Sequence, residues 1–290
     1  MKKTLAALII GAFAASAANA AVVYDNEGTK VEVNGSVRLL LEKSNQGGKN
    51  DTGTVKRNSH SGLKNDGSRV AFKVKHNLSS GYYALGNVEI RFDGKDPVTG
   101  EQNTKADGFG NLYTKRAYVG LGSKAYGEVT FGRQLLIADD LSTANDYEYG
   151  IIEKKHYIPT DANSAIRYDY RGVKDLQVSA SYQFADKRNT KNEVVSGTVS
   201  NGYQFGAIYD GKFDDVNGLI AKFGYGRTVY KTDLTSTKKH TDGFLASLGY
   251  THADLVLSVD GGYARDKHAQ GENSVRRYFV SPGFSFPVIA

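Results

Sequence analysis

The chain has 290 residues, contains neither cysteine nor tryptophan, and carries 33 glycines, 19 tyrosines and a formal net charge of +6. The lack of cysteine excludes a disulfide-stabilised secreted domain, and no apolar run beyond the N-terminal segment approaches the roughly 20 residues of a membrane-spanning helix. The basic residues are scattered along the chain, without a basic face interleaved with aromatic residues, which argues against nucleic-acid binding.

The N-terminus has the pattern of a secretory signal. Met1-Lys2-Lys3 precedes an apolar run from Leu5 to Ala15, and the small residues Ala18-Asn19-Ala20 follow. This pattern is typical of a signal peptide that is cleaved before Ala21. We therefore expect residues 1–20 to be the signal peptide and residues 21–290 to form an exported domain.

Alternation of apolar with polar side chains dominates the rest of the chain, in about twelve runs of roughly ten residues each, the segment length of membrane-spanning strands. The runs end alternately in a short turn and a long polar loop. Successive side chains of a strand point to opposite faces, so each run predicts a strand with one apolar and one polar face. The expected strands, in chain order, are residues 30–42, 69–76, 82–92, 112–121, 127–132, 166–170, 176–184, 203–209, 219–225, 243–251, 255–265 and 276–286.

Two of these runs show the composition of the two faces. In the second run, the cations Arg69, Lys73 and Lys75 share the face opposite to the apolar side chains, which indicates a hydrated interior. In residues 176–184 the apolar positions alternate with glutamine and serine. A strand whose outward positions are all apolar and whose inward positions are all polar is difficult to place in the core of a soluble protein.

A soluble β-sandwich or jelly roll also alternates apolar with polar residues and is the competing interpretation. The export signal and the alternation of short with long connections favour a barrel whose two rims face different compartments. We therefore predict an all-β fold, a transmembrane antiparallel β-barrel with lipid outside and water inside.

Neither catalysis nor metal binding has a recognisable motif. The histidines are spread one per segment without ligand-like spacing, and neither a Gly-x-Ser-x-Gly elbow nor a phosphate-binding glycine loop is present in a strand-turn-helix context. No catalytic, cofactor-binding or metal site is expected, and no cofactor. The histidines are His60, His76, His156, His240, His252 and His268.

The longest break in the pattern, residues 134–163, is acidic. Structureless connections of this length in a compact domain are usually functional or disordered. Two interpretations stay open, an exposed acidic loop and a loop folded into the channel. The acidic candidates for a constriction are Asp139, Asp140, Asp146 and Glu148.

A loop folded inward would place acidic groups opposite basic residues of the wall and set a transverse field across a narrow opening. Charged side chains in pores tune ion preference in this way. Since the basic wall favours anions and the acidic loop favours cations, the sign of the selectivity stays open. The candidate basic pore-lining residues are Arg38, Arg69, Lys73, Lys115 and Arg167.

Several segments resemble the general diffusion porins of Gram-negative outer membranes. They are the run from Ala21 to Gly35, Gly67-Ser68-Arg69-Val70-Ala71-Phe72, Arg116-Ala117-Tyr118-Val119-Gly120-Leu121 and Val129-Thr130-Phe131-Gly132-Arg133. The signal and the segment Arg277-Tyr278-Phe279-Val280-Ser281-Pro282-Gly283-Phe284 are most similar to the major porins of Haemophilus and related Pasteurellaceae.

The resemblance implies a homotrimer of sixteen-stranded barrels in the outer membrane, surrounded by lipid and lipopolysaccharide, through which ions and small hydrophilic solutes diffuse passively. It also implies a third loop folded inward opposite a basic wall, in which Arg69 and Lys115 match basic positions of the family. Ser36 stands where many members carry lysine. The usual Pro-Glu-Phe-Gly-Gly type of loop sequence is absent, so Asp146 and Glu148 match the acidic side by location alone.

The end of the chain departs from the family, whose last residue is usually an aromatic. The last expected strand corresponds to the twelfth of sixteen, so we expect a barrel truncated at its C-terminus by four strands. Closure of twelve strands into a narrower barrel is the alternative. Besides a diffusion channel, the open functional hypotheses are a surface adhesin or receptor with long loops, a non-functional truncated product and an outer-membrane hydrolase.

Overall fold

The structure is a computed structural model that describes residues 20–49, 55–92, 112–143, 154–232, 238–268 and 274–286. Of the predicted signal peptide, residues 1–20, all but the last residue lie outside the described residues. By its contacts the chain divides into two compact units. Unit 1 is residues 1–76 with 87–117, and unit 2 is residues 77–86 with 118–290.

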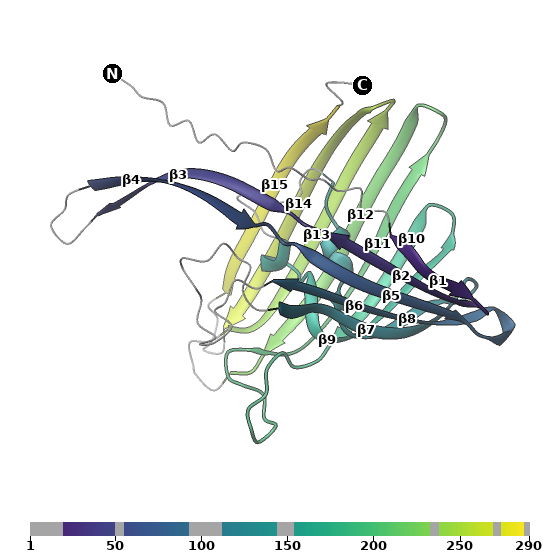
Figure 1. Ribbon diagram of the computed structural model, residues 1–290. Coiled ribbons are helices and arrows are strands. Elements are labelled where there is room, and N and C mark those ends of the chain that lie inside the picture. Colours follow the sequence, from purple (N-terminus) through teal and green to yellow (C-terminus); the bar gives the residue numbers. More distant parts are fainter. Residues whose placement is uncertain are drawn as a thin grey trace. The chain divides into compact units, whose positions relative to one another are not determined.

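The described residues are mostly antiparallel β-strand (Figure 1). Thirteen strands form one sheet in the order β1, β2, β5 and then consecutively to β15, and β3 (Leu39–Lys49) pairs with β4 (Val55–Asn65) as a separate hairpin. The all-β, antiparallel prediction is confirmed. The strands of the sheet are β1 (Ala21–Asn26), β2 (Thr29–Ser36), β5 (Arg69–Asn77), β6 (Tyr82–Phe92), β7 (Leu112–Ser123), β8 (Gly127–Leu135), β9 (Asp161–Val173), β10 (Leu176–Gln183), β11 (Val199–Lys212), β12 (Asn217–Tyr230), β13 (Lys238–His252), β14 (Leu255–His268) and β15 (Ser274–Ser285).

The twelve expected strands correspond to β2 and to β5 through β15. The sequence pattern missed three strands, all in unit 1. β1 folds back on β2 through the turn residues Glu27 and Gly28, both of which have positive φ. The expected first strand also ends earlier than predicted, because β2 pairs with β5 and stops at Ser36, whereas β3 pairs with β4. The polar sequence of β4 has no apolar period, so it was expected to be a loop.

In unit 2, strands β9 to β15 pair each with the next, and short connections alternate with long ones, as the pattern predicted. The short turn between β11 and β12 shows how a polar sequence closes such a connection. The Asp214 carboxylate accepts hydrogen bonds from the backbone N–H groups of Val216 and Asn217, at 2.8 and 2.7 Å, and from the Asn217 side chain. These bonds, the side-chain bond first, lower the pKa of Asp214.

Three short 3₁₀ turns are the helical segments of the described ranges: η1 (Ser79–Gly81), η2 (Ile137–Asp140) and η3 (Lys154–His156). None of them has the length and apolarity that a membrane-crossing helix needs.

The two faces of the unit 2 sheet have opposite chemistry and opposite exposure. On β13 the buried positions Thr241, Gly243, Leu245, Ser247 and Gly249 alternate with exposed ones. β10 repeats the pattern, because its serines are buried while its aromatic side chain is exposed. A sheet of a water-soluble protein usually buries its apolar face, so this inversion is the arrangement of a strand with lipid on one side. The exposed apolar side chains include Tyr182, Phe184, Tyr203, Phe205, Phe223, Phe244, Leu248, Tyr250, Leu257, Val259 and Tyr263.

Two adjacent residues of β14 test this assignment. Val259 is exposed on the apolar face of the sheet, and the side chain of Ser258 lies on the opposite, polar face. Because the chain has no cysteine, Val259→Cys and Ser258→Cys each introduce a unique thiol. In vesicles we expect a lipid-soluble maleimide to label the first and a charged, water-soluble reagent to label the second. The opposite preference contradicts the assignment of the faces.

Candidate functional site

A cluster of arginines surrounds one buried carboxylate in unit 1. Glu89 on β6 has a side chain that is 5% exposed. Its Oε1 accepts from Nη2 and Nε of Arg91, both at 2.6 Å, and Arg69 Nη1 lies 3.9 Å from the same oxygen. Arg116 Nη1 lies 3.3 Å from Oε2. Three neighbouring strands thus bring three guanidinium groups to one acid.

Arg38 adds a fourth positive charge to this cluster. It lies between β2 and β3, where its backbone N–H donates to the hydroxyl of buried Ser68 at 2.9 Å. Ser68 is held in turn by the Asn65 side chain, which accepts from its N–H at 2.8 Å. The charges of Arg38, Arg91 and Arg116 all act on Arg69. We call Arg38, Arg69, Arg91 and Arg116 with Glu89 the arginine cluster; it has a clear excess of positive charge.

The structure distributes the predicted basic residues unevenly. Arg38 and Arg69 lie in the arginine cluster, whereas Lys73 is exposed on β5 and stands opposite Glu32 in the β2 register. Lys115 precedes Arg116, so it points to the other side of β7, the side of Val119 and Leu121, which are 62% and 57% exposed. Arg116 is therefore the residue of β7 that reaches Glu89.

Arg91 and Arg116 were missed as site residues, although the alternation of apolar with polar residues places both of them on the polar face. Counting back by twos along β7 from the exposed Val119 separates Arg116 from the apolar face. Arg91 shares the predicted polar face of β6 with Glu89. Alternation identifies the face of each arginine, but the meeting at Glu89 depends on strand register.

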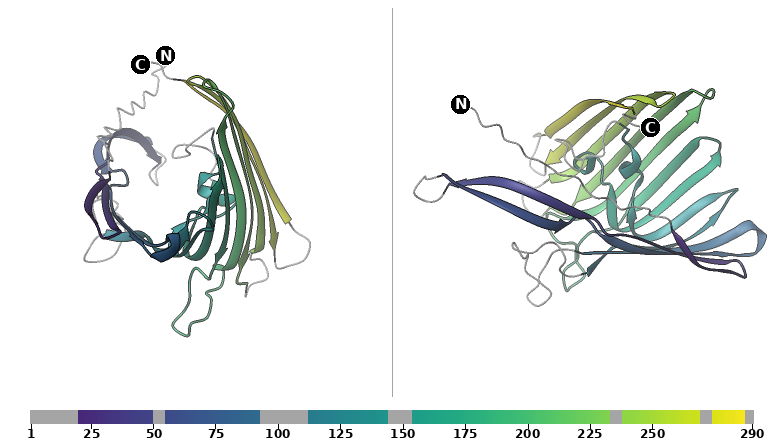
Figure 2. Two further views of the ribbon diagram at one scale, coloured as in Figure 1. Left: turned by 90° about the vertical axis from the view of Figure 1, so that its right-hand side faces the viewer. Right: turned by 45° about the horizontal axis from the view of Figure 1, so that its top comes forward.

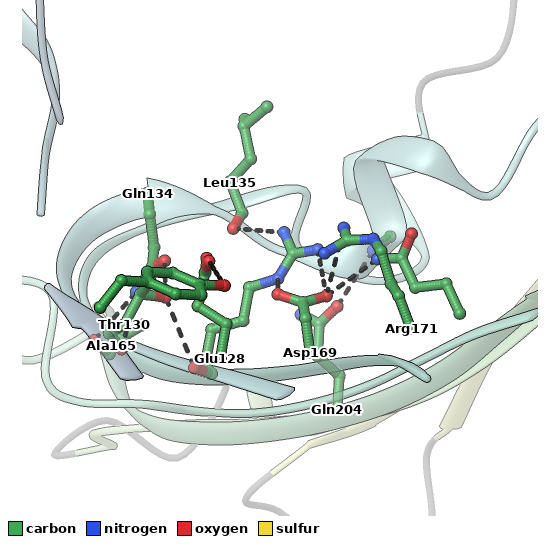
Figure 3. A network of polar contacts seen from close by, with 12 residues as sticks. Glu128, Thr130, Gln134, Leu135, Ala165, Asp169, Arg171 and Gln204 are labelled. Carbon is green, nitrogen blue, oxygen red and sulfur yellow. Dashed lines mark hydrogen bonds and ion pairs between the residues drawn. The ribbon is translucent and has the colours of Figure 1, made fainter. Parts of the chain in front are cut away.

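A separate network of polar contacts in unit 2 includes Leu135 and Asp169 (Figure 3), and Arg167 binds both of them. Its Nε and Nη2 donate to the two oxygens of Asp169 at 2.7 and 2.8 Å, and its Nη1 donates to the Leu135 carbonyl at 2.9 Å. Gln177 donates to Asp169 as well, at 2.8 Å. Arg167 is thus on the predicted polar face, but it is buried and paired, and it holds the backbone at the end of β8.

The two described ends of the long acidic segment pack on the polar face of the sheet in unit 2 (Figure 2). We call residues 136–143 and 154–160 the covering segments. Ile137, Leu141 and Ile158 are each 1% exposed, and they form an apolar cluster with Leu245 and other wall residues. Full burial of an aliphatic side chain contributes about 1.5–3 kcal/mol, so this cluster stabilises the segments on the sheet. Its remaining members are Ala138, Tyr157, Ala264 and Phe279.

Polar contacts add to the apolar ones, with one side chain from each of five consecutive strands, β11 to β15. Most of these bonds reach the backbone of the covering segments, so they hold the path of the chain rather than particular side chains. The contacts are Gln204 to the Ala138 N–H (3.3 Å) and the Pro159 carbonyl (3.0 Å), Lys222 to the Ser142 carbonyl (2.6 Å), Ser247 to the Thr143 hydroxyl (2.7 Å), Asp260 to the Thr143 N–H (3.1 Å) and Arg277 to the His156 carbonyl (2.6 Å).

Two of the four predicted acidic residues lie within the part of the chain that the structure describes. Asp139 and Asp140 lie in η2, where Asp140 is exposed and its charge acts on Lys222. Lys154 Nζ donates to the Asp139 carbonyl and so links the two covering segments. Asp146 and Glu148 lie outside the described residues. The described ends of the segment are packed on the sheet rather than extended into solvent.

Comparison with known proteins identifies the family to which the sequence is similar. Residues 4–288 match a family described as Gram-negative porin. The major outer membrane protein of Pasteurella multocida strain Pm70 is 33% identical over 280 residues, which cover 92% of this chain and 74% of the relative. A second major outer membrane protein of Pasteurella multocida is 34% identical over 288 residues, covering 95% and 76%.

Solved structures give the same answer for the fold. An anion-selective porin from Comamonas acidovorans has a TM-score of 0.61 at 19% identity and covers 90% of this chain and 75% of its own. The OmpF of Salmonella typhi in complex with daunomycin has a TM-score of 0.60 at 15% identity, with coverages of 89% and 75%. These likenesses show a fold of the porin type.

Proposed function

This chain belongs to the Gram-negative porin family and is an outer-membrane diffusion channel, and we propose that its arginine cluster and covering segments determine which solutes pass. The family and the names of the relatives indicate a channel rather than an enzyme. They do not favour a surface adhesin.

The observation that carries the channel function is the inverted exposure of the unit 2 sheet. Its polar face bears Gln204, Thr228, Ser247, Asp260 and Asp266, all of which are buried, whereas its aromatic and aliphatic face is exposed. Lipid-spanning barrels alternate apolar-outward with polar-inward residues along every strand. The polar face is then the wall of an aqueous path.

The exposed face also has the aromatic side chains that suit a lipid boundary. A row of rings crosses β11 to β14, and the centroids of Phe205 and Tyr225 are 5.4 Å apart, those of Tyr225 and Phe244 4.8 Å, and those of Phe244 and Tyr263 6.4 Å. Tyrosine rings can be buried in lipid while their hydroxyl groups reach the headgroups. This supports contact with outer-membrane lipid and lipopolysaccharide, and assembly of the channel as a homotrimer is proposed with it.

The arginine cluster biases the channel toward anions. Positive groups that are only partly neutralised raise the local concentration of anions and repel cations in a pore. Three guanidinium groups meet at the Glu89 carboxylate, Arg38 adds a fourth positive charge beside them, and the side chains of Arg69 and Arg116 are each 26% exposed. Lys73, on the side of β5 that carries Arg69, keeps its predicted contribution to the basic wall as a proposal, whereas Lys115 lies on the Val119 and Leu121 side of β7 and is not counted in it.

The covering segments narrow the path. They place a layer of backbone and apolar side chains on the wall, where Leu245, Ala264 and Phe279 pack against them. The acidic residues Asp139 and Asp140 are carried on this layer. The transverse field predicted from the sequence requires these acids to face the basic wall, and it stays a prediction.

Conductance tests the proposed function. We expect the purified chain, inserted into planar lipid bilayers, to produce stable conductance steps that are carried by ions and by small hydrophilic solutes. Circular dichroism of the same preparation establishes that it has folded as β-sheet. A chain that folds and inserts into lipid but never conducts contradicts the proposal.

A further inference from the structure

Three glycines interrupt the polar face of β12 and β13. Gly224 and Gly226 lie on β12 between Lys222 and Thr228, on the same side of the strand, where alternation predicts polar side chains. Gly243 on β13 stands directly opposite Gly226 in the register. None of the three has a positive φ, so the backbone conformation is not the reason for glycine.

The covering segments fill the space that side chains would occupy at these positions. A Cβ added at Gly243 would lie 1.9 Å from the Tyr157 carbonyl oxygen, and one at Gly224 would lie 2.2 Å from Leu141 Cδ1. A Cβ at Gly226 would lie 2.7 Å from Ile158 Cγ2. Carbon atoms that are not bonded have their optimum separation at about 3.5–4.0 Å, so a side chain at any of the three positions requires the neighbour to move.

This approach is closer than ordinary packing allows. Layers that pack through their side chains on a sheet lie about 10 Å from it. At Gly243 a backbone carbonyl, which has no rotamer to change, touches the sheet itself. The missing side chains therefore determine how near the backbone of the covering segments can come to the wall.

We propose that Gly224, Gly226 and Gly243 form a glycine bed, a set of positioning residues that sets how closely the covering segments lie against the sheet, and with it the width left open to solutes. The second part rests on the proposed function of the segments as the narrowing element. Substitution in the bed pushes the segments away from the wall, which narrows the path.

The three contacts differ in how they can be relieved, which gives the experiment its contrast. At Gly224 the obstacle is the end of the flexible Leu141 side chain, so Gly224→Val is expected to displace the segment and Leu141→Ala to rescue it. At Gly243 the obstacle is backbone, so Gly243→Ala has no such rescue. Gly261→Ala, on the opposite face of the sheet with Val259 and Tyr263, is the control for adding a side chain to a strand glycine, because the nearest atom to its added Cβ is at 3.6 Å, an ordinary contact.

A disulfide measures the position of the segment independently of conduction. A Cβ at Gly249 would lie 3.3 Å from Thr143 Cγ2, within reach of a disulfide. Because the chain has no other cysteine, Thr143→Cys with Gly249→Cys is a unique pair. In this background we expect Gly224→Val to at least halve the disulfide yield under mild oxidation, and Leu141→Ala to restore it.

Single-channel conductance is measured on the same variants. We expect it to fall for Gly224→Val and Gly243→Ala, to recover in the Gly224→Val, Leu141→Ala double variant, and to stay unchanged for Gly261→Ala. Unchanged disulfide yield and conductance in folded Gly224→Val overturn the glycine bed and leave the channel function intact. If the unsubstituted chain does not conduct while the disulfide yield falls and recovers as expected, the positioning role stands and the channel function fails.

Discussion

Replacement of Arg69 and Arg116 by glutamine is expected to shift the ion preference of the channel toward cations. The two substitutions remove half of the positive charges of the arginine cluster while leaving Arg91, whose Nη2 is 2.6 Å from Glu89 Oε1. The buried carboxylate therefore keeps a partner, which avoids the large cost of an isolated buried charge. Two charges lost from a pore wall change its potential where ions are least screened by water.

The reversal potential in a potassium chloride gradient measures this preference. We expect a several-fold change in the anion-to-cation permeability ratio at low salt and a smaller one at high salt, since the Debye length falls from about 30 Å at 0.01 M to about 3 Å at 1 M. Glu89→Gln makes the cluster more positive and is expected to shift the potential in the opposite direction.

Lys174→Gln is the matched control, because it removes a positive charge from an exposed residue of the turn between β9 and β10. It is expected to leave the reversal potential unchanged. Equal reversal potentials for the Arg69→Gln, Arg116→Gln variant and the unsubstituted channel would show that the arginine cluster does not face the ion path.

Leu248→Arg is expected to destabilise the folded protein in lipid by up to about 2–4 kcal/mol, the cost that a cation on the lipid face reaches at the bilayer midplane. Leu248 is 54% exposed on the apolar face of β13 and stands opposite Val259 of β14. Ser258, next to Val259, lies on the polar face and stands opposite Gly249. Ser258→Arg thus places the same cation at nearly the same height on the other side of the sheet.

Urea unfolding of both variants in lipid vesicles, followed by the mobility shift between folded and unfolded bands in gel electrophoresis, compares the two costs. We expect Ser258→Arg to stay within about 1 kcal/mol of the unsubstituted chain, as substitutions at solvated surface positions usually do. Equal destabilisation by the two substitutions would mean that both faces meet the same medium, which contradicts a membrane-spanning sheet.

The strands were predictable to the extent that one of their faces is apolar. Residues 176–184 alternate cleanly, and the structure has β10 there with the predicted faces. β13 covers the strand expected at residues 243–251. β4 has polar residues on both faces, so it leaves no period to detect. β1 was missed as a strand of the sheet because its pairing with β2 depends on the turn at Glu27 and Gly28.

The candidate site was predictable residue by residue but not as a constellation. Arg38 and Arg69 were expected on the polar wall, and both belong to the arginine cluster. Arg69 lies beside Glu89, and the charge of Arg38 acts on Arg69. Arg167 was expected there too, and alternation puts Asp169 on the same face two residues further on, but no local pattern indicates the contact of Arg167 with the Leu135 carbonyl. The glycine bed could not be predicted from the sequence, because glycine has no side chain and therefore does not indicate which face of a strand it lies on.

The sequence by itself determined which side of each strand is apolar, because side-chain alternation is a local property with a period of two. Together with the export signal and the alternation of short with long connections, it predicted an all-β protein of the outer-membrane type. Only the tertiary structure decided which polar residues meet. Glu89 and Arg116 come together through the register of separate strands, and Tyr157 reaches Gly243 because a segment distant in sequence lies on the sheet. Such contacts depend on pairing and packing between residues far apart along the chain, which no local pattern records.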